Sequence, residues 1–187
     1  MASIQKKEAI LVAAAKLFRD RGYQATSMRD LAEAVDLKAS SLYNHIGSKE
    51  EILSDICMQN ADRFSAEMGN IEQTTNSPID KIKALINLHI EMAITDYTSI
   101  TSFNDEWRHL SEPSLSEFTS KRKLYEQQFL EIIEEGISQD QLKSMDPQIC
   151  LNTILSSTRW VYDYKPKAEM GEAANTIVNM LLHGISK

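Results

Sequence analysis

The segment TSMRDLAEAVDLKASSLYNHIGSKEEIL, residues 26–53, limits the fold of this chain more than any other. Ser27 with Asp30, and then Ser48 with Glu51, are pairs in which a hydroxyl and an acidic side chain cap the first turn of a helix. The helix that begins at Ser27 is therefore only about two turns long. Helices this short do not bury a core of their own, so we expect them to pack with neighbouring helices into one compact unit.

A third short helix is predicted between these two caps, over about residues 38–45, with Leu42 turned inward. A longer helix over about 4–20 precedes them and stops at Gly22, which accepts a left-handed backbone. Apolar residues three and four apart predict further helices along the rest of the chain. These are expected at about 48–68, from Pro78 after a break at 69–78, near 99–110, from Pro113 to Gly136, from Asp146-Pro147 onward, and at about 167–184.

Strand signals are nearly absent, because no stretch alternates apolar and polar residues for long and only 6 Gly and 4 Pro punctuate the 187 residues. The sequence therefore predicts an all-α fold. Cys57 and Cys150 stand singly in apolar helical patterns, so we expect buried, reduced thiols. No run approaches the roughly 18 apolar residues of a membrane span, which favours a soluble, cytoplasmic protein.

Charge is distributed unevenly along the chain. The net charge is −7, which for the whole chain disfavours a polyphosphate partner. Residues 1–50, however, carry 8 Lys and Arg against 6 Asp and Glu, so the excess of acid lies entirely in the remainder. Only the first quarter of the chain is suited to approach a nucleic-acid backbone.

Two short helices joined by a tight turn, the second of them polar and exposed, are typical of a helix-turn-helix. In that motif the second helix enters the major groove, where hydroxyl, amide and ammonium groups contact phosphates and base edges. Such groups are present on the segment 38–45. An alternative interpretation takes SLYNH as an ordinary solvated turn. The basic first quarter favours the DNA-binding interpretation.

The stretch FRDRGYQATSMRDLAEAVDLKASSLYNHIGSKEEIL resembles the DNA-binding domain of the tetracycline-repressor (TetR) family. The resemblance implies an N-terminal helix-turn-helix domain at 1–47 and a C-terminal effector-binding and dimerisation bundle at 48–187. It implies phosphate contacts by Thr26, Ser27, Arg29, Tyr43, His45 and Lys49. It implies base-facing positions at Lys38, Ala39, Ser40, Ser41 and Asn44. It implies a core of Phe18, Tyr23, Leu31, Ala32 and Leu42.

Four positions of this stretch depart from the family pattern, one of them Ser40, where a Gly or small residue is common and an extra hydroxyl now reaches toward the groove. Asp36 stands where Gly is usual, a change that the turn tolerates because Asp enters the left-handed region more readily than most residues. Lys38 replaces the usual Ser or Thr cap, so the third helix is expected to begin without a side-chain cap. Ile46 replaces a usual Phe, which we interpret as a change in packing.

The stretches NDEWRHLSEP and KRKLYEQQFLEIIEEGI resemble the C-terminal domains of TetR regulators that respond to fatty acids or acyl-CoA thioesters, although Asp140 replaces a usual Gly. An acyl chain needs an apolar space between helices, and an anionic head group needs a cation such as Arg108 or Arg122. The predicted effector-binding residues are His89, Met92, Phe103, Trp107, Arg108, Arg122, Tyr125, Phe129 and Trp160, with Tyr97 and Tyr164 as further candidates for the lining.

The expected function is a ligand-responsive transcription factor, a repressor that a small, lipid-like or acyl-CoA effector releases from a palindromic operator. A homodimer is expected through apolar faces of the last two helices. Those faces are Ile149, Ile154, Leu155 and Val161, with Ile177, Met180, Leu181 and Ile185, and the alternative is that they are core of one chain. The rival function is an architectural or interaction protein of the same fold without an effector.

An enzyme is the other rival class, and the sequence lacks its usual motifs. There is no GxSxG, no GxxxxGK[ST] and no HExxH. His89, Asp105, Glu106 and His109 could be imagined as a metal or acid-base cluster, but lone His residues on apolar helix faces are more often interior residues with ordinary hydrogen bonds. No catalytic residue, cofactor or metal is therefore expected.

Overall fold

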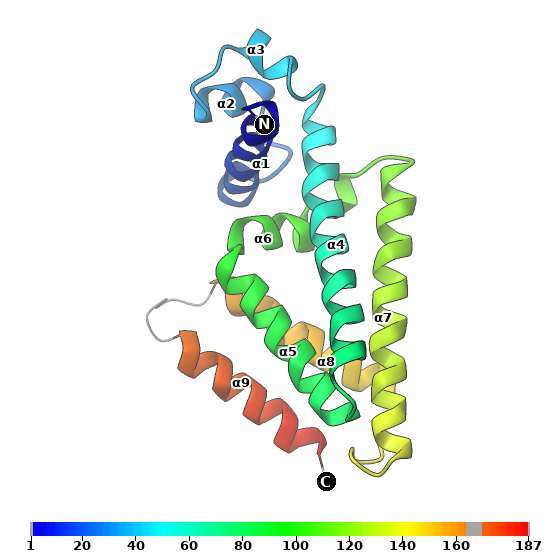
Figure 1. The fold of residues 1–187 in the computed structure, drawn as a ribbon. Coiled ribbons are helices and arrows are strands. Elements are labelled where there is room, and N and C mark those ends of the chain that lie inside the picture. Colours follow the sequence, from blue (N-terminus) through cyan, green and yellow to red (C-terminus); the bar gives the residue numbers. More distant parts are fainter. Residues whose placement is uncertain (1, 164–169, 187) are drawn as a thin grey trace. The chain divides into compact units, whose positions relative to one another are not determined.

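The structure, a computed structural model, describes residues 2–163 and 170–186, and within them it is built from helices (Figure 1). The helices are α1 (Ala2–Arg21), α2 (Met28–Ala34), α3 (Ala39–Tyr43), α4 (Lys49–Thr74), α5 (Pro78–Thr95), α6 (Tyr97–Asp105), η1 (Trp107–His109), α7 (Ser114–Ser138), α8 (Pro147–Arg159), η2 (Trp160–Asp163) and α9 (Met170–Ile185). Extended pairing in this part of the chain is limited to one isolated bridge between Leu142 and Ser186. The all-α prediction is confirmed.

The helix boundaries near the N-terminus follow the predicted local signals. Gly22 has a φ of +85°, and its N–H donates to the carbonyl of Phe18 at 2.7 Å, which ends α1. Ser27 caps α2 in a reciprocal capping box with Asp30. Asp36 takes the left-handed conformation expected of it, with a φ of 52°. Lys38 precedes α3 without a side-chain cap, as predicted, and the helix is shorter than the expected 38–45.

Two predicted helix ends are wrong, because the chain continues in helical form through Gly69 and Gly136. α4 extends to Thr74, and buried Met68 and Ile71 on either side of Gly69 anchor it. A glycine inside a helix costs only about 1 kcal/mol, which such packing outweighs. The last helix begins, among the described residues, at Met170, so the predicted start at 167 lies outside them, as does Tyr164.

Contacts divide the chain into two compact units. Unit 1 contains Met1–Asp62 and Thr98–Thr119, and unit 2 contains Arg63–Tyr97 and Ser120–Lys187. α4 thus contributes residues to both. The predicted boundary at residue 47 separates functions rather than contact clusters and remains a prediction.

The core of unit 1 gathers the inward faces of α1, α2, α3 and the first half of α4, and it includes Leu110 and Phe118. In unit 2, α5 lies against α8 and α9. Its fully buried side chains include Ile82, Leu85 and Ile86 of α5, Phe129 and Ile133 of α7, and Ile154 of α8. Both cysteines are buried and unpaired, as predicted. No helix in the described ranges is long and apolar enough to cross a membrane.

Candidate DNA-binding site

The helix-turn-helix lies in unit 1, where α2 and α3 pack against each other and α2 packs against α1 (Figure 1). The connection is short because Asp36 reverses the chain with its positive φ, while the Leu37 N–H donates to the carbonyl of Ala32 at 2.9 Å. The predicted core is confirmed, since all five of its members are buried: Phe18, Tyr23, Leu31, Ala32 and Leu42. Ile46 is buried as well.

The second helix of the motif presents nearly all of its side chains to solvent. Leu42 is fully buried and anchors α3, whereas Tyr43 is 53% exposed. Ser41 and His45 are partly exposed, and the remaining predicted base-facing residues are exposed: Lys38, Ala39, Ser40 and Asn44. A helix with one inward anchor and a polar outer face has the form of a recognition helix.

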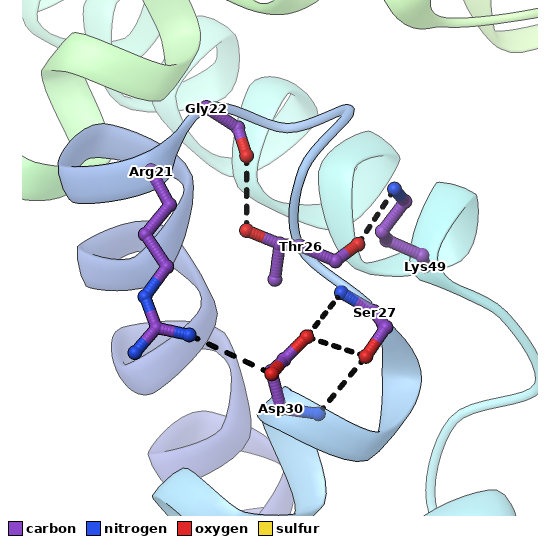
Figure 2. Close-up of polar contacts among 6 residues, drawn as sticks. All are labelled: Arg21, Gly22, Thr26, Ser27, Asp30 and Lys49. Atoms are coloured by element: carbon purple, nitrogen blue, oxygen red, sulfur yellow. Dashed lines mark hydrogen bonds and ion pairs between the residues drawn. The ribbon is translucent and has the colours of Figure 1, made fainter.

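The start of α2 shows how the sequence shapes the adjoining surface (Figure 2). The Ser27 N–H donates to Asp30 Oδ2 at 2.8 Å, and the Asp30 N–H donates to Ser27 Oγ at 3.2 Å. Hydrogen bonds from Ser27 hold the pKa of the Asp30 carboxyl below its ordinary value, and Arg21, whose Nη1 lies 3.5 Å from Asp30 Oδ1, adds to this effect. Arg29, on the first turn of α2, is exposed.

Thr26 corrects the set of predicted phosphate contacts. Its side chain is only 1% exposed, and its hydroxyl donates to the carbonyl of Gly22 at 2.9 Å (Figure 2). The Thr26 N–H donates to the carbonyl of Tyr23 at 3.2 Å. The expected surface position is therefore wrong: the loop between α1 and α2 needs this hydroxyl inside, because the turn after Gly22 leaves a carbonyl to be satisfied.

Lys49 is also engaged within unit 1. Its ammonium donates to the carbonyls of Tyr23 and Thr26, each at 2.7 Å, and lies 4.3 Å from the centre of the Tyr23 ring. An ammonium has three N–H donors, so one remains for a phosphate. Lys49 thus joins the start of α4 to the loop before α2, a role that sequence reasoning missed because those carbonyls lie more than twenty residues away.

The same loop is tied to the segment that follows α6. The Tyr23 N–H donates to Glu106 Oε1 at 3.2 Å, and the Tyr23 ring stacks on His109 with centroids 5.2 Å apart. His109 Nδ1 lies 3.1 Å from Gln24 Nε2. Glu106 and His109, weighed above as a metal or acid-base cluster, are therefore used in packing, and the described part of the chain contains no group of His, Cys, Asp and Glu suited to a metal.

The predicted effector residues fall into both units. Phe103, Trp107 and Arg108 belong to unit 1, where the exposed Arg108 guanidinium lies 4.7 Å from the centre of the Trp107 ring. Arg122 is exposed and paired with Glu126 at 2.8 Å, so it does not reach the interior of unit 2. Trp160 is 47% exposed. Met92, Tyr125 and Phe129 are buried in unit 2, and His89 is partly buried there.

Comparison with known proteins agrees with this architecture. Residues 10–56 match the family described as bacterial regulatory proteins, tetR family, and residues 75–185 match the tetracyclin repressor-like C-terminal domain. The HTH-type transcriptional repressor KstR2 of Mycolicibacterium smegmatis is 25% identical over 190 residues, which cover 97% of this chain and 91% of that protein.

Solved structures share the fold over almost the whole chain. The ketosteroid transcriptional regulator KstR2 of Mycobacterium tuberculosis superposes with a TM-score of 0.91 at 22% identity, covering 97% of this chain and 95% of its own. AibR, solved in complex with isovaleryl coenzyme A and operator DNA, has a TM-score of 0.82 at 24% identity, with 94% and 97% covered. At these identities the likeness shows the fold.

An exposed recognition helix on a buried helical scaffold defines a helix-turn-helix regulator that binds DNA. The two family matches, which together span most of the sequence, assign it further: the chain belongs to the TetR family of transcriptional regulators. Members of this class act by binding DNA and are not enzymes.

Proposed function

We propose that this protein is a repressor that occupies a palindromic operator as a homodimer and leaves it when a small apolar effector binds. The observation that carries the proposal is the outer face of α3, where polar side chains surround a single inward anchor, Leu42. KstR2 of Mycolicibacterium smegmatis is described as a transcriptional repressor, which supports the sign of the regulation.

On DNA, the exposed side chains of this unit divide into two roles. Contacts to phosphates position the protein without reading the base sequence. They are proposed for Tyr43, His45, Lys49, Ser27 and Arg29. The residues proposed to face base edges in the major groove are Lys38, Ala39, Ser40, Ser41 and Asn44. Asn44 carries an amide that can donate and accept at once, as the edge of adenine requires.

The test compares two neighbouring substitutions. Duplexes selected from a random pool by the wild-type protein are bound again by Tyr43→Phe and Asn44→Ala, with fluorescence anisotropy as the readout. Tyr43→Phe is expected to weaken binding to all duplexes alike. Asn44→Ala is expected to change their ranking, by about 1–3 kcal/mol at one position of each half-site. A uniform loss in Asn44→Ala would contradict its base-reading role.

The homodimer is proposed because one short recognition helix reads only a few base pairs, and two can span half-sites about 34–36 Å apart. Part of the predicted surface is buried within the chain, namely Ile154, Val161 and Ile177. Ile149 and Met180 remain 66% and 72% exposed on α8 and α9. Together with the partly exposed Leu155, Leu181 and Ile185, they form the apolar face proposed for the partner subunit.

The effector is proposed to be an apolar molecule bound by unit 2, with an acyl-CoA thioester as the leading class. The structural neighbour AibR was solved in complex with isovaleryl coenzyme A, which supports the choice of this ligand class. In this chain the interior of unit 2 contains His89, Met92, Tyr125 and Phe129. Arg122 is paired with Glu126 and Arg108 belongs to unit 1, so neither is assigned to a head group of the effector.

A further inference from the structure

His89 of α5 and Tyr125 of α7 form a hydrogen-bonded pair among aromatic rings in unit 2. His89 Nε2 and the Tyr125 hydroxyl are 2.8 Å apart. Phe64 stacks on the His89 ring with centroids 4.7 Å apart and meets the Tyr125 ring edge-on at 5.7 Å. Phe129 contacts the other side of Tyr125, at 6.4 Å. The pair is thus a polar group among aromatic side chains.

Both members of the pair are uncharged at neutral pH. Burial lowers the pKa of His89 to about 4 and raises the pKa of Tyr125 well above its ordinary value. The contacts that the structure shows for these two side chains are with each other and with aromatic rings. An anionic group placed against the pair would lose its hydration without gaining a cation there, which is costly.

The pair also leaves hydrogen-bonding capacity unused. Among the described residues, His89 Nδ1 has no hydrogen-bond partner, and it is not a fully enclosed atom. His89 keeps part of its surface accessible even though burial dominates its pKa. His89 thus presents an unpaired and accessible ring nitrogen beside its bond to Tyr125.

The position of the protons in the pair determines which hydrogen-bond donor is left unpaired. If the Tyr125 hydroxyl donates to Nε2, the proton of the neutral ring is on Nδ1 and is free to be donated. If Nε2–H donates to the tyrosine oxygen instead, the hydroxyl proton is the free one, and Nδ1 becomes an acceptor. In each arrangement one N–H or O–H remains to be satisfied, and an acceptor-only ligand group satisfies it in both.

We propose that His89 and Tyr125 form the recognition site for a neutral carbonyl oxygen of the effector, either a thioester or a ketone, whose apolar chain packs against the neighbouring rings. This proposal rests on the proposed function, in which unit 2 binds the effector. A carbonyl matches the surplus donor, since it accepts and does not donate.

The experiment removes the carbonyl from the ligand and its partner from the protein. The full chain is titrated calorimetrically with decanoyl-CoA and with S-decyl-CoA, a thioether that lacks the carbonyl. A second arm compares 2-decanone with 2-methyl-1-decene, in which CH2 replaces the oxygen, by thermal shift. The wild-type protein is expected to prefer the carbonyl-bearing probe about 3- to 10-fold in the arm that matches the natural class. The arm that shows the preference distinguishes thioester from ketone.

Tyr125→Phe keeps the ring packing and removes the hydroxyl, whereas His89→Phe removes the ring N–H. The preference should fall to within about 2-fold in the variant that loses the free donor, which is His89→Phe in the first arrangement and Tyr125→Phe in the second. His89→Gln, which retains an N–H donor, should recover part of a preference lost in His89→Phe. The comparison of two ligands on each variant removes effects on folding, because a general loss of structure weakens both probes alike.

The outcomes separate this inference from the proposed function. Equal binding of both members of each probe pair by the wild-type protein, or a preference that survives in both Tyr125→Phe and His89→Phe, would overturn the carbonyl site. Release from a selected duplex by S-decyl-CoA as readily as by decanoyl-CoA would overturn it too, yet would support an apolar effector. Failure of every apolar probe to bind or to release DNA would overturn both the site and the effector, while binding to the duplex itself stands as a separate measurement.

Discussion

Lys49 combines a proposed DNA contact with hydrogen bonds that hold the loop between α1 and α2. Lys49→Ala removes the donor to the carbonyls of Tyr23 and Thr26, so we expect the free energy of unfolding to fall by about 1–2 kcal/mol. Loss of a phosphate contact should also lower the slope of log K against log salt by about 0.9 in each subunit. Urea denaturation and anisotropy at several salt concentrations measure the two effects.

Arg29→Ala is the matched control for this prediction, because Arg29 is exposed and the structure shows no partner for it among the described residues. It should lower the salt slope and leave the free energy of unfolding within about 0.5 kcal/mol of the wild-type value. A salt slope unchanged in Lys49→Ala would show that Lys49 acts on DNA only through the loop it holds.

His89 gives unit 2 a pH dependence of known sign. Its pKa is about 4 in the folded protein and about 6.5 in the unfolded chain, so the unfolded state takes up a proton first as the pH falls. The free energy of unfolding is therefore unaffected by His89 above pH 7, and it decreases progressively as the pH falls from 6.5 to 4. At pH 5 the loss is about 2 kcal/mol relative to pH 7.5.

The measurement is the free energy of unfolding of wild type and His89→Phe across this range. The difference between the two curves isolates His89, because the other three histidines are common to both proteins. Its hydrogen-bond partner Tyr125 stays neutral throughout, since burial raises its pKa. Parallel curves for the two proteins would refute the assignment of a buried, neutral His89.

At the scale of elements, two glycines inside helices differ in the space around them. A Cβ at Gly136 of α7 would lie 2.8 Å from Leu142 Cδ1, whereas a Cβ at Gly69 of α4 would meet no atom within 4 Å. Leu142 is buried and has little room to move. Gly136 is thus needed for close approach of the chain, and Gly69 is a weak point in an otherwise continuous helix.

We therefore expect opposite effects of the same substitution. Gly136→Ala should lower the free energy of unfolding by about 1–3 kcal/mol through overpacking. Gly69→Ala should raise it by about 0.5–1 kcal/mol, because alanine favours the helix and restricts the unfolded chain. Chemical denaturation of both variants checks the pair, and destabilisation by Gly69→Ala would mean that α4 needs its glycine for another reason.

At the scale of the whole molecule, the proposed dimer rests on side chains that one chain leaves exposed. Met180→Asp places a charge on the apolar face of α9, where the wild-type side chain is 72% exposed within the single chain. The variant should keep its helical circular dichroism, sediment as a monomer at micromolar concentration, and lose most operator affinity, because two linked heads bind far better than one.

Leu124→Asp is the control for the dimer. Leu124 is 62% exposed on α7, so the same charge at this position should leave both folding and association intact. A wild-type monomer at micromolar concentration, or dissociation by Leu124→Asp instead of Met180→Asp, would contradict the proposed interface.

What the sequence determined by itself rests on interactions between residues a few positions apart. Three local features could be predicted from residue type alone. They are the capping box of Ser27 and Asp30, the Asp146 cap of α8 and the left-handed turn at Asp36. The periodic apolar faces likewise identified the buried residues Phe18, Leu31 and Leu42. Those local signals were sufficient for the all-α fold and for the outward face of the recognition helix.

Only the tertiary structure decided which partner each polar or flexible residue meets. Thr26 turns inward to Gly22, Lys49 reaches the carbonyls of a loop far away in the sequence, and His89 meets Tyr125 from another helix. No periodicity encodes such pairs, because they depend on how separate helices pack and on which donors burial leaves unsatisfied. Gly69 and Gly136 remained helical for the same reason: side chains distant in the sequence supplied the packing that outweighed a poor local propensity.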